Sequence, residues 1–269
     1  MLNYRRIIRP LAGLSLAVVA TMAFGQEKIR LAVLPFSESL PAIIADKQGY
    51  FKAEGLEVEM TKFNAGALAL PVLQSGKLDI ALNNTISTLQ AIEQGLDLTL
   101  LAPSAVVRSQ GADTTTALTV LKGSIKSPKE LEGKRIAVNV INSSAWLYAV
   151  GYLDKVGIDR AKVRFVEVPF PQMNDPLLNK QVDAIVQVEP FNTILADTGK
   201  VDTVAFTYVE VQPGGDITQF IALTPWVKKN PETAKKFQRA IAKGAQFAMA
   251  AGNEAAVRTI NQEFTGLNP

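Results

Sequence analysis

Two short stretches decide the fold: Leu31-Ala32-Val33 followed by Ser37-Glu38-Ser39, and Ile136-Ala137-Val138 followed by Asn142-Ser143-Ser144. Each has the pattern of a buried apolar strand that runs into a polar turn and then into a helix. The two strands begin 105 residues apart, and a third element repeats in the same order, since Asp79-Ile80-Ala81-Leu82 corresponds to Asp183-Ala184-Ile185-Val186. The sequence therefore predicts two similar α/β lobes.

Apolar runs of strand length recur along the chain, with segments of helical length between them. Such runs are typical of strands that are buried on both faces of a parallel sheet. One helix is expected over residues 40–51, and another over 85–94 with Asn84 as its N-cap. Each lobe is thus predicted to be a mainly parallel sheet flanked by helices. The predicted strands are 29–36, 56–63, 80–82, 98–102, 136–140, 163–168, 184–188 and 204–206.

Two polar segments are expected to cross between the lobes. Residues 104–119 carry a polar run without periodicity, and residues 209–218 contain Gln-Pro-Gly-Gly-Asp. Residues 219–223 would then be a short strand that returns to the first lobe. The predicted boundaries are 26–110 for the first part of lobe 1, 111–212 for lobe 2 and 213–269 for the return to lobe 1. Two crossings of this kind form a hinge.

The first 25 residues are predicted to be a cleavable signal peptide. Arg5, Arg6 and Arg9 precede an apolar run over 11–19 and the small residues around Gly25. The alternative is a transmembrane anchor, but residues 11–24 are short for the ~20 apolar residues that a span needs. The mature protein is therefore expected in the periplasm.

The composition excludes several classes of function. The chain has no Cys and no His, so disulfides, Cys/His metal cages and Ser-His-Asp or Cys-His mechanisms are absent. Without the three leader arginines, the 28 Lys and Arg fall to the same number as the 25 Asp and Glu. A net charge of zero gives no electrostatic attraction to nucleic acid. We expect no catalytic residue, no metal and no cofactor.

The chain reads Tyr-Phe-Lys-Ala-Glu-Gly-Leu-Glu-Val at residues 50–58 and Ser-Pro-Lys-Glu-Leu-Glu-Gly-Lys-Arg-Ile-Ala-Val at residues 127–138. With three further motifs, these stretches resemble the periplasmic solute-binding proteins of ABC importers, in the group that takes nitrate, sulfonates, taurine and thiamine-pyrimidine precursors. The likeness covers about residues 28–265 and implies a two-lobed type II fold, an inner-membrane permease as partner, a monomer and no enzyme activity. A thiamine-pyrimidine synthase of the same fold is associated with an essential His and a Cys-rich segment, which this chain lacks. Family members continue through further C-terminal helices, so the return to lobe 1 is expected to be shortened at Pro269. The motifs span residues 34–37, 50–58, 70–81, 127–138 and 188–191.

The turns that follow the strands are the candidate ligand contacts, because ligands of open α/β sheets bind beyond the carboxyl ends of the strands. Hydroxyls, amides and free helix N–H groups suit the oxygens of a sulfonate, carboxylate or nitrate. Each of these polar residues would also serve as a helix cap, and Trp146 would also serve as core packing, so a purely structural role stays open. The candidates are Ser37, Glu38, Ser39, Asn64, Gly66, Asn84, Thr85, Asn142, Ser143, Ser144, Trp146 and Glu189.

The ligand class that these residues favour is a small organic anion, of sulfonate or carboxylate type. No Arg is placed at a strand end, which disfavours a phosphate-like ligand. Glu38 and Glu189 complicate a purely anionic ligand, since a carboxylate pairs with an ammonium or an aminopyrimidine nitrogen. A taurine-like zwitterion, an aminopyrimidine, and an exported ligand-sensing subunit of a receptor are therefore the alternatives.

Overall fold

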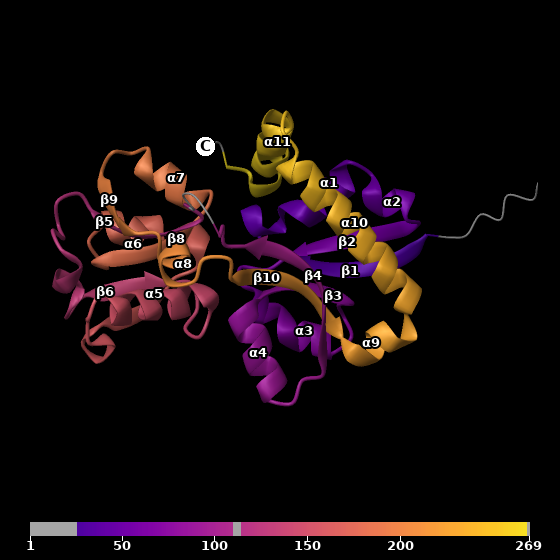
Figure 1. The fold of residues 1–269 in the computed structure, drawn as a ribbon, viewed down its shortest axis with the longest axis horizontal. Coiled ribbons are helices and arrows are strands. Elements are labelled where there is room, and N and C mark those ends of the chain that lie inside the picture. Colours follow the sequence, from indigo (N-terminus) through magenta and orange to yellow (C-terminus); the bar gives the residue numbers. More distant parts are fainter. Residues whose placement is uncertain (1–25, 110–113, 268–269) are drawn as a thin grey trace, which may run out of the picture.

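The computed structural model describes residues 26–109 and 114–267. They form two five-stranded sheets, each at the centre of one lobe, and the lobes lie side by side (Figure 1). Lobe 1 is defined here by the sheet of β1–β4 and β10 with its helices, and lobe 2 by the sheet of β5–β9. The strands of lobe 1 are β1 (Glu27–Val33), β2 (Leu56–Lys62), β3 (Ile80–Asn84), β4 (Leu98–Val106) and β10 (Asp216–Leu223).

The two sheets have the same strand order, which confirms the predicted two-lobed α/β fold. The order is β2-β1-β3-β10-β4 in lobe 1 and β7-β6-β8-β5-β9 in lobe 2. In each sheet the fourth strand, β10 or β5, pairs antiparallel with both neighbours, and the other pairings are parallel. The strands of lobe 2 are β5 (Thr116–Leu121), β6 (Arg135–Val138), β7 (Arg164–Glu167), β8 (Ala184–Val188) and β9 (Val201–Ala205).

An Arg–Asp pair at the start of the central strands repeats in both lobes. In lobe 1 the Asp79 carboxylate accepts hydrogen bonds from the main-chain N–H of Arg30 at 2.8 Å and from its guanidinium at 2.7 and 2.9 Å. In lobe 2 Asp183 accepts from the N–H of Arg135 at 2.8 Å and from its Nε at 3.3 Å. The same pair thus joins β1 to the residue before β3, and β6 to the residue before β8.

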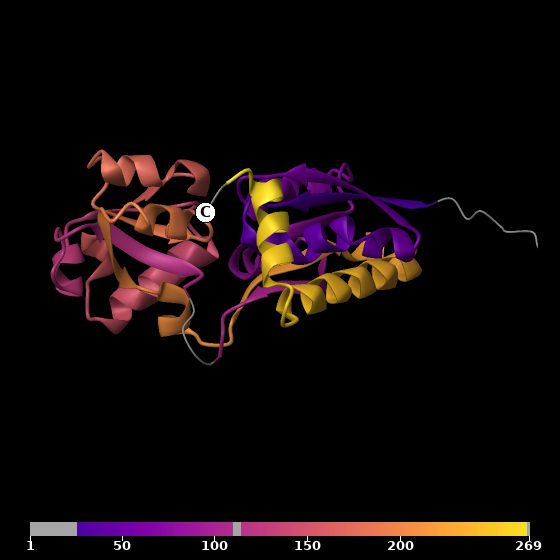
Figure 2. The ribbon, with the colours of Figure 1, turned by 90° about the horizontal axis from the view of Figure 1, so that it is seen from above.

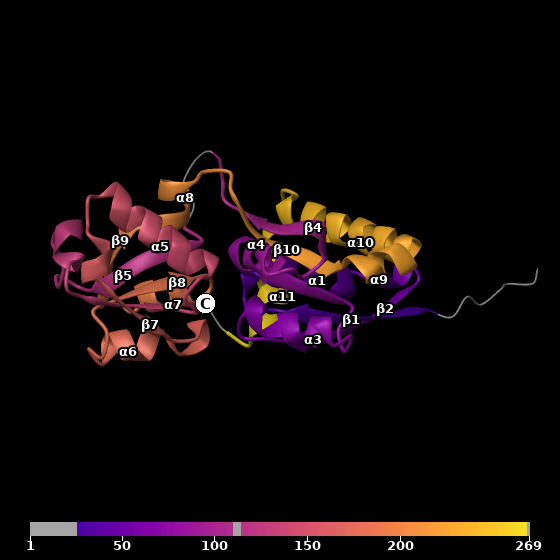
Figure 3. The same cartoon turned by 90° about the horizontal axis from the view of Figure 1, so that it is seen from below.

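Helices cover both faces of the lobe 1 sheet, with α1, α2 and α10 on one face and α3 and α4 on the other (Figures 1 and 3). Gly244 lets α10 approach α1 closely, because a Cβ at this position would lie 2.0 Å from the carbonyl oxygen of Pro41. Phe237 of α10 stacks on Phe51 with ring centroids 5.6 Å apart. The helices are α1 (Leu40–Lys47), α2 (Tyr50–Ala53), α3 (Leu70–Gln74), α4 (Thr85–Glu93), α9 (Thr224–Lys229), α10 (Pro231–Met249) and α11 (Glu254–Thr265).

Lobe 2 is built in the same way on a smaller set of helices. Helices α5 and α8 lie on one face of its sheet, and α6 and α7 lie on the other (Figures 1 and 3). The helices are α5 (Ser144–Lys155), α6 (Asn174–Leu178), α7 (Phe191–Ala196) and α8 (Thr207–Val211).

Two connections join the lobes, and Figure 2 shows them side by side. One leads from β4 to β5 and the other from α8 to β10. The N–H of Val107 on the first donates to the carbonyl of Gly215 on the second at 2.9 Å. Tyr148 of α5 packs on Tyr208 with ring centroids 4.7 Å apart, and its hydroxyl donates to Gln212 Oε1 at 3.2 Å. Both connections are therefore held in place at one aromatic pair of lobe 2, Tyr148 and Tyr208.

The structure corrects two local predictions. The expected helix over 40–51 is divided into α1 and α2 at Gly49, whose φ of 71° is left-handed. The expected polar crossing over 104–119 is a strand at both ends, because β4 continues to Val106 and β5 begins at Thr116. The predicted signal peptide, residues 1–25, lies outside the described residues. Within the described residues no helix has the length and apolarity needed to cross a membrane.

Candidate functional site

A small pocket lies between the two lobes. Its free volume of about 20 Å³ holds about one water molecule, so a solute can enter only if the lobes move apart. Its walls come from both lobes and from the start of β10. Lobe 1 supplies Leu34, Phe36, Glu38, Ala65, Gly66 and Asn84; lobe 2 supplies Asn139, Ser143, Ser144, Ala145, Phe170 and Tyr208; and β10 supplies Ile217 and Thr218.

The N-termini of α4 and α5 both reach this pocket. Asn84 caps α4 by accepting the N–H of Ser87 at 2.8 Å, and Ser143 caps α5 by accepting the N–H of Trp146 at 3.3 Å. Capping leaves other first-turn N–H groups of each helix without an intrahelical partner, at the positive end of the helix dipole. The two helix N-termini, one from each lobe, thus present donors for an anion at the pocket wall.

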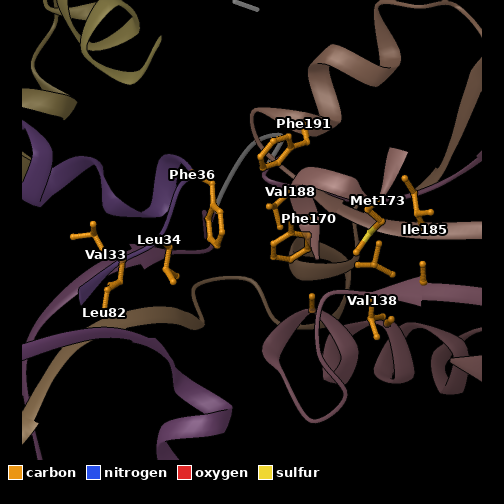
Figure 4. Close-up of a cluster of buried hydrophobic side chains, with 14 of the residues drawn as sticks. Val33, Leu34, Phe36, Leu82, Val138, Phe170, Met173, Ile185, Val188 and Phe191 are labelled. Atoms are coloured by element: carbon orange, nitrogen blue, oxygen red, sulfur yellow. The ribbon is translucent and has the colours of Figure 1, made fainter. Parts of the chain in front are cut away.

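Direct contacts already join the lobes around the pocket. Ser144 Oγ of α5 donates to Asn84 Oδ1 at 3.2 Å. Phe36 of lobe 1 meets Phe170 of lobe 2 edge-to-face, with ring centroids 5.4 Å apart and planes at 87° (Figure 4). The pocket therefore has an aromatic wall on one side and a polar wall of helix caps on another.

Glu38 is the charged residue of the pocket wall, and it is buried, with 8% of its surface exposed. Its main-chain carbonyl accepts a hydrogen bond from Ser104 Oγ. Burial raises the pKa of the Glu38 carboxyl to about 7, because the ionised form loses its hydration. Among the described residues that line the pocket, none is Lys or Arg.

Five of the twelve predicted contacts line this pocket: Glu38, Gly66, Asn84, Ser143 and Ser144. Gly66 is needed there for close approach, since a Cβ would lie 2.3 Å from Asn83 Oδ1. Asn84 and Ser143 each cap a helix and also line the pocket.

The other seven predicted contacts do not line the pocket, and four of them are held by other partners. Ser39 Oγ accepts the N–H of Leu34 at 2.8 Å, and Thr85 Oγ1 donates to Gln219 Oε1 at 2.8 Å. The Ser37 hydroxyl accepts from Asn261 Nδ2 at 3.3 Å. Trp146 packs edge-to-face on Phe165, with ring centroids 6.0 Å apart.

Glu189, Asn64 and Asn142 lie outside the pocket as well. The Glu189 carboxylate accepts from the Thr193 N–H at 3.2 Å and from Thr193 Oγ1 at 3.0 Å, within the first turn of α7. Burial raises the pKa of Glu189, and the hydrogen bonds from Thr193 oppose that rise. Asn64 is exposed, and Asn142, with a φ of 66°, lines a separate hollow beside α4.

Three polar residues of the pocket were not predicted: Asn139, Tyr208 and Thr218. Asn139 follows β6 directly, but the strand was predicted over 136–140, so Asn139 was counted as part of the strand and not as part of the turn after it. Tyr208 lies on α8 and Thr218 on β10, at the two ends of the connection that returns to lobe 1. Thr218 is 3% exposed, and its Oγ1 has no hydrogen-bond partner among the described residues. The sequence feature that could have indicated Thr218 is its position as a polar residue close to the Gly-Gly pair of the predicted crossing.

The chain is similar to proteins named as binding proteins and to proteins named as synthases. A family model described as "NMT1/THI5 like" matches residues 37–255. The taurine-binding periplasmic protein of Escherichia coli is 25% identical over 225 residues, which cover 83% of this chain and 68% of the relative. The 4-amino-5-hydroxymethyl-2-methylpyrimidine phosphate synthase THI11 of Saccharomyces cerevisiae is 23% identical over 244 residues, which cover 80% of this chain and 65% of the relative.

Solved structures show the same fold. The alkanesulfonate-binding protein SsuA from Xanthomonas axonopodis pv. citri, bound to MOPS, superimposes with a TM-score of 0.76. The match covers 90% of this chain and 80% of that protein, at 17% sequence identity. The likeness is therefore one of architecture: two lobes of mainly parallel sheet, joined by two crossings.

Proposed function

Because the chain belongs to the NMT1/THI5-like family, we propose that it is the periplasmic substrate-binding component of an ABC importer. In this proposal it captures a small organic acid, a sulfonate or a carboxylate, in the pocket between the lobes and delivers it to a membrane permease. The observation that carries the proposal is that both lobes and the returning strand β10 contribute walls to one pocket.

The helix caps support an acidic group on the ligand. The first turns of α4 and α5 offer neutral N–H donors, and the hydroxyls of Ser144 and Thr218 lie in the same wall. Neutral donors at helix N-termini bind a sulfonate or carboxylate without a mobile counter-charge. The lack of Lys and Arg among the described lining residues disfavours a phosphate, which binds best to cationic side chains.

We assign a binding function rather than a catalytic one. The family includes relatives named as synthases, but the sequence has no His and no Cys to serve as general base or thiolate nucleophile. Capture between two lobes needs no chemical step, only a ligand that binds the closed arrangement better than the open one. We further propose that the protein acts as a monomer, exported to the periplasm by a cleaved leader.

The test is ligand binding to the purified exported protein, measured by thermal unfolding and calorimetry with alkanesulfonates, taurine, short carboxylates and nitrate. A ligand at one hundred times its dissociation constant stabilises the folded state by about 2.7 kcal/mol. We expect at least one sulfonate or carboxylate to do so, and deletion of the gene to abolish its uptake by cells. A folded protein that binds none of these compounds, or one that turns a substrate over, would refute the proposed function.

A further inference from the structure

Glu38 is an acidic side chain that the fold buries without a partner. The residue is 8% exposed and lines the pocket, and burial is the only influence on its pKa. Among the described residues, no hydrogen bond or cation therefore offsets the burial of its carboxyl group. An uncompensated buried charge is strongly unfavourable, so folded proteins usually pair it. The missing partner is therefore expected from outside the chain.

Three other acids with shifted pKa values, Asp79, Asp183 and Glu189, are satisfied internally. Asp79 is paired with Arg30, and Asp183 with Arg135. Glu189 accepts hydrogen bonds from the N–H and the hydroxyl of Thr193. Glu38 differs from these three acids in two ways. Its carboxyl group has no such partner, and it lines the pocket between the lobes, which none of the three does.

The aromatic residues of the pocket wall also suit a cation. Phe36 lies two residues before Glu38 and meets Phe170 across the gap, so two aromatic rings border the site. Aromatic faces attract a desolvated ammonium, and a carboxylate gives it a charge-assisted hydrogen bond. A second anionic group at this end would meet like charge in a site of low polarity, which disfavours it.

We propose that Glu38 selects ligands that carry a protonated nitrogen, so that the solute is a small zwitterion. Its ammonium end donates to the Glu38 carboxylate, and its sulfonate or carboxylate end binds at the N-termini of α4 and α5 with Ser144 and Thr218. This inference rests on the proposed function and narrows it to one substrate class. The aminated ligand supplies the counter-charge that the chain itself does not give to Glu38.

The experiment compares matched ligand pairs that differ only in the amine. Taurine is titrated against ethanesulfonate, and β-alanine against propionate, at pH 8 on the wild-type protein by calorimetry. We expect each aminated compound to bind at least tenfold more tightly than its partner. Equal affinities within both pairs would overturn the inference and leave the proposed function standing, whereas no binding by any compound to the folded protein would overturn both.

Two carboxylate variants assign the effect to Glu38. The Glu38→Gln variant is expected to lose the preference for the amine and to keep the affinity for ethanesulfonate. The matched control Glu189→Gln changes an acid outside the pocket and should keep the preference. Glu38→Asp provides a second reading if the amide variant unfolds, and is expected to weaken the preference by shortening the side chain. A preference that persists in both Glu38 variants would refute the assignment.

Discussion

The Glu38 carboxyl makes the stability of the unliganded protein depend on pH. Burial raises its pKa from 4.5 to about 7 in the folded state. Between these values the folded protein holds a proton that the unfolded chain has released, so the free energy of unfolding falls as pH rises through this window. The loss reaches about 3 kcal/mol above pH 7, because each tenfold difference in proton affinity between the two states corresponds to about 1.4 kcal/mol.

The variant Glu38→Gln is therefore expected to remove this part of the pH dependence. At pH 8 it should be more stable than wild type by up to about 3 kcal/mol, and at pH 4 the two should be similar. Urea unfolding of both proteins at the two pH values measures the difference. Glu93→Gln at the exposed end of α4 is the control and should follow the wild-type profile. Parallel profiles for wild type and Glu38→Gln would contradict the buried, ionisable state of this side chain.

Thr218 is expected to show opposite effects on stability and binding. Its buried hydroxyl has no partner among the described residues, and an unsatisfied buried polar atom costs about 1–3 kcal/mol. Thr218→Val keeps the shape and should raise the stability of the unliganded protein by about 1 kcal/mol while it weakens ligand binding about tenfold. Thermal unfolding and calorimetry measure the two effects, with Thr203→Val on β9 as an exposed control. Unchanged affinity in Thr218→Val would remove this hydroxyl from the site.

Among the strands, the repeated Arg–Asp pairs stabilise the two sheets unequally. The Asp79 side chain is 11% exposed and accepts three hydrogen bonds, whereas Asp183 is 34% exposed and accepts two. Burial opposes ionisation of both, but the hydrogen bonds from Arg30 and Arg135 outweigh it and lower both pKa values. Their contribution is thus present at neutral pH and lost as pH falls through the lowered values.

The substitution Asp79→Asn is accordingly expected to destabilise the protein more than Asp183→Asn. We expect losses of about 2 kcal/mol and about 1 kcal/mol, because hydrogen bonds to charged groups are worth more when they are less exposed to solvent. Urea unfolding at pH 7 and at pH 3 measures them, and the gap between wild type and each variant should narrow at pH 3. Equal losses would show that burial does not distinguish the two pairs.

The sequence predicts the inner strands β3, β6 and β8 because their apolar runs are buried on both faces. It also predicts the half-exposed edge strands β2 and β7 from their apolar residues, and β5 shows why one inner strand was missed. Thr116 and Thr119 are each 1% exposed, so this central strand buries hydroxyls where the pattern expects apolar side chains. The preceding threonines extend the polar appearance of the segment into β5. The repeat of strand, turn and helix was predictable because it depends only on local patterning.

The site was predictable to the extent that it is made of helix caps. Asn84 ends β3, and Ser143 and Ser144 lie where α5 begins after β6, so position in the sequence places all three at the sheet edge. Tyr208 on α8 and Thr218 on β10 reach the pocket only because the two lobes pack together there, which no local pattern encodes. Trp146 lies in the first turn of α5, but the turn of the helix directs its ring to Phe165.

Gly215 lies on the connection from α8 to β10, where a small change would alter the orientation of one lobe relative to the other. A Cβ at this position would lie 2.9 Å from the Tyr148 hydroxyl, between the connection and α5. Gly215→Ala is expected to weaken ligand binding about tenfold without contact with the ligand, because a shifted hinge lowers the population of the binding-competent arrangement. Adding Tyr148→Phe removes the nearest obstructing atom, while the Gln212 side chain stays 3.1 Å from the added Cβ, so this change should restore part of the affinity. Calorimetry of the single and double variants tests this, and failure of the second substitution to restore binding would place the effect elsewhere.

Capture of a solute between two moving lobes is best tested by distances measured within the protein in solution. The sequence has no Cys, so spin labels can be attached at introduced cysteines alone. One pair of labels joins Met249 on α10 to Leu147 on α5, across the lobes. A control pair joins Met249 to Leu89, both within lobe 1. All three side chains are accessible to a label, since Met249 is 78% exposed, Leu147 39% and Leu89 54%. Double electron–electron resonance should show that a saturating ligand shortens the mean distance across the lobes and narrows its distribution, and leaves the distance of the control pair unchanged. Unchanged distances for both pairs, with binding proven by calorimetry on the same labelled protein, would contradict capture by closure.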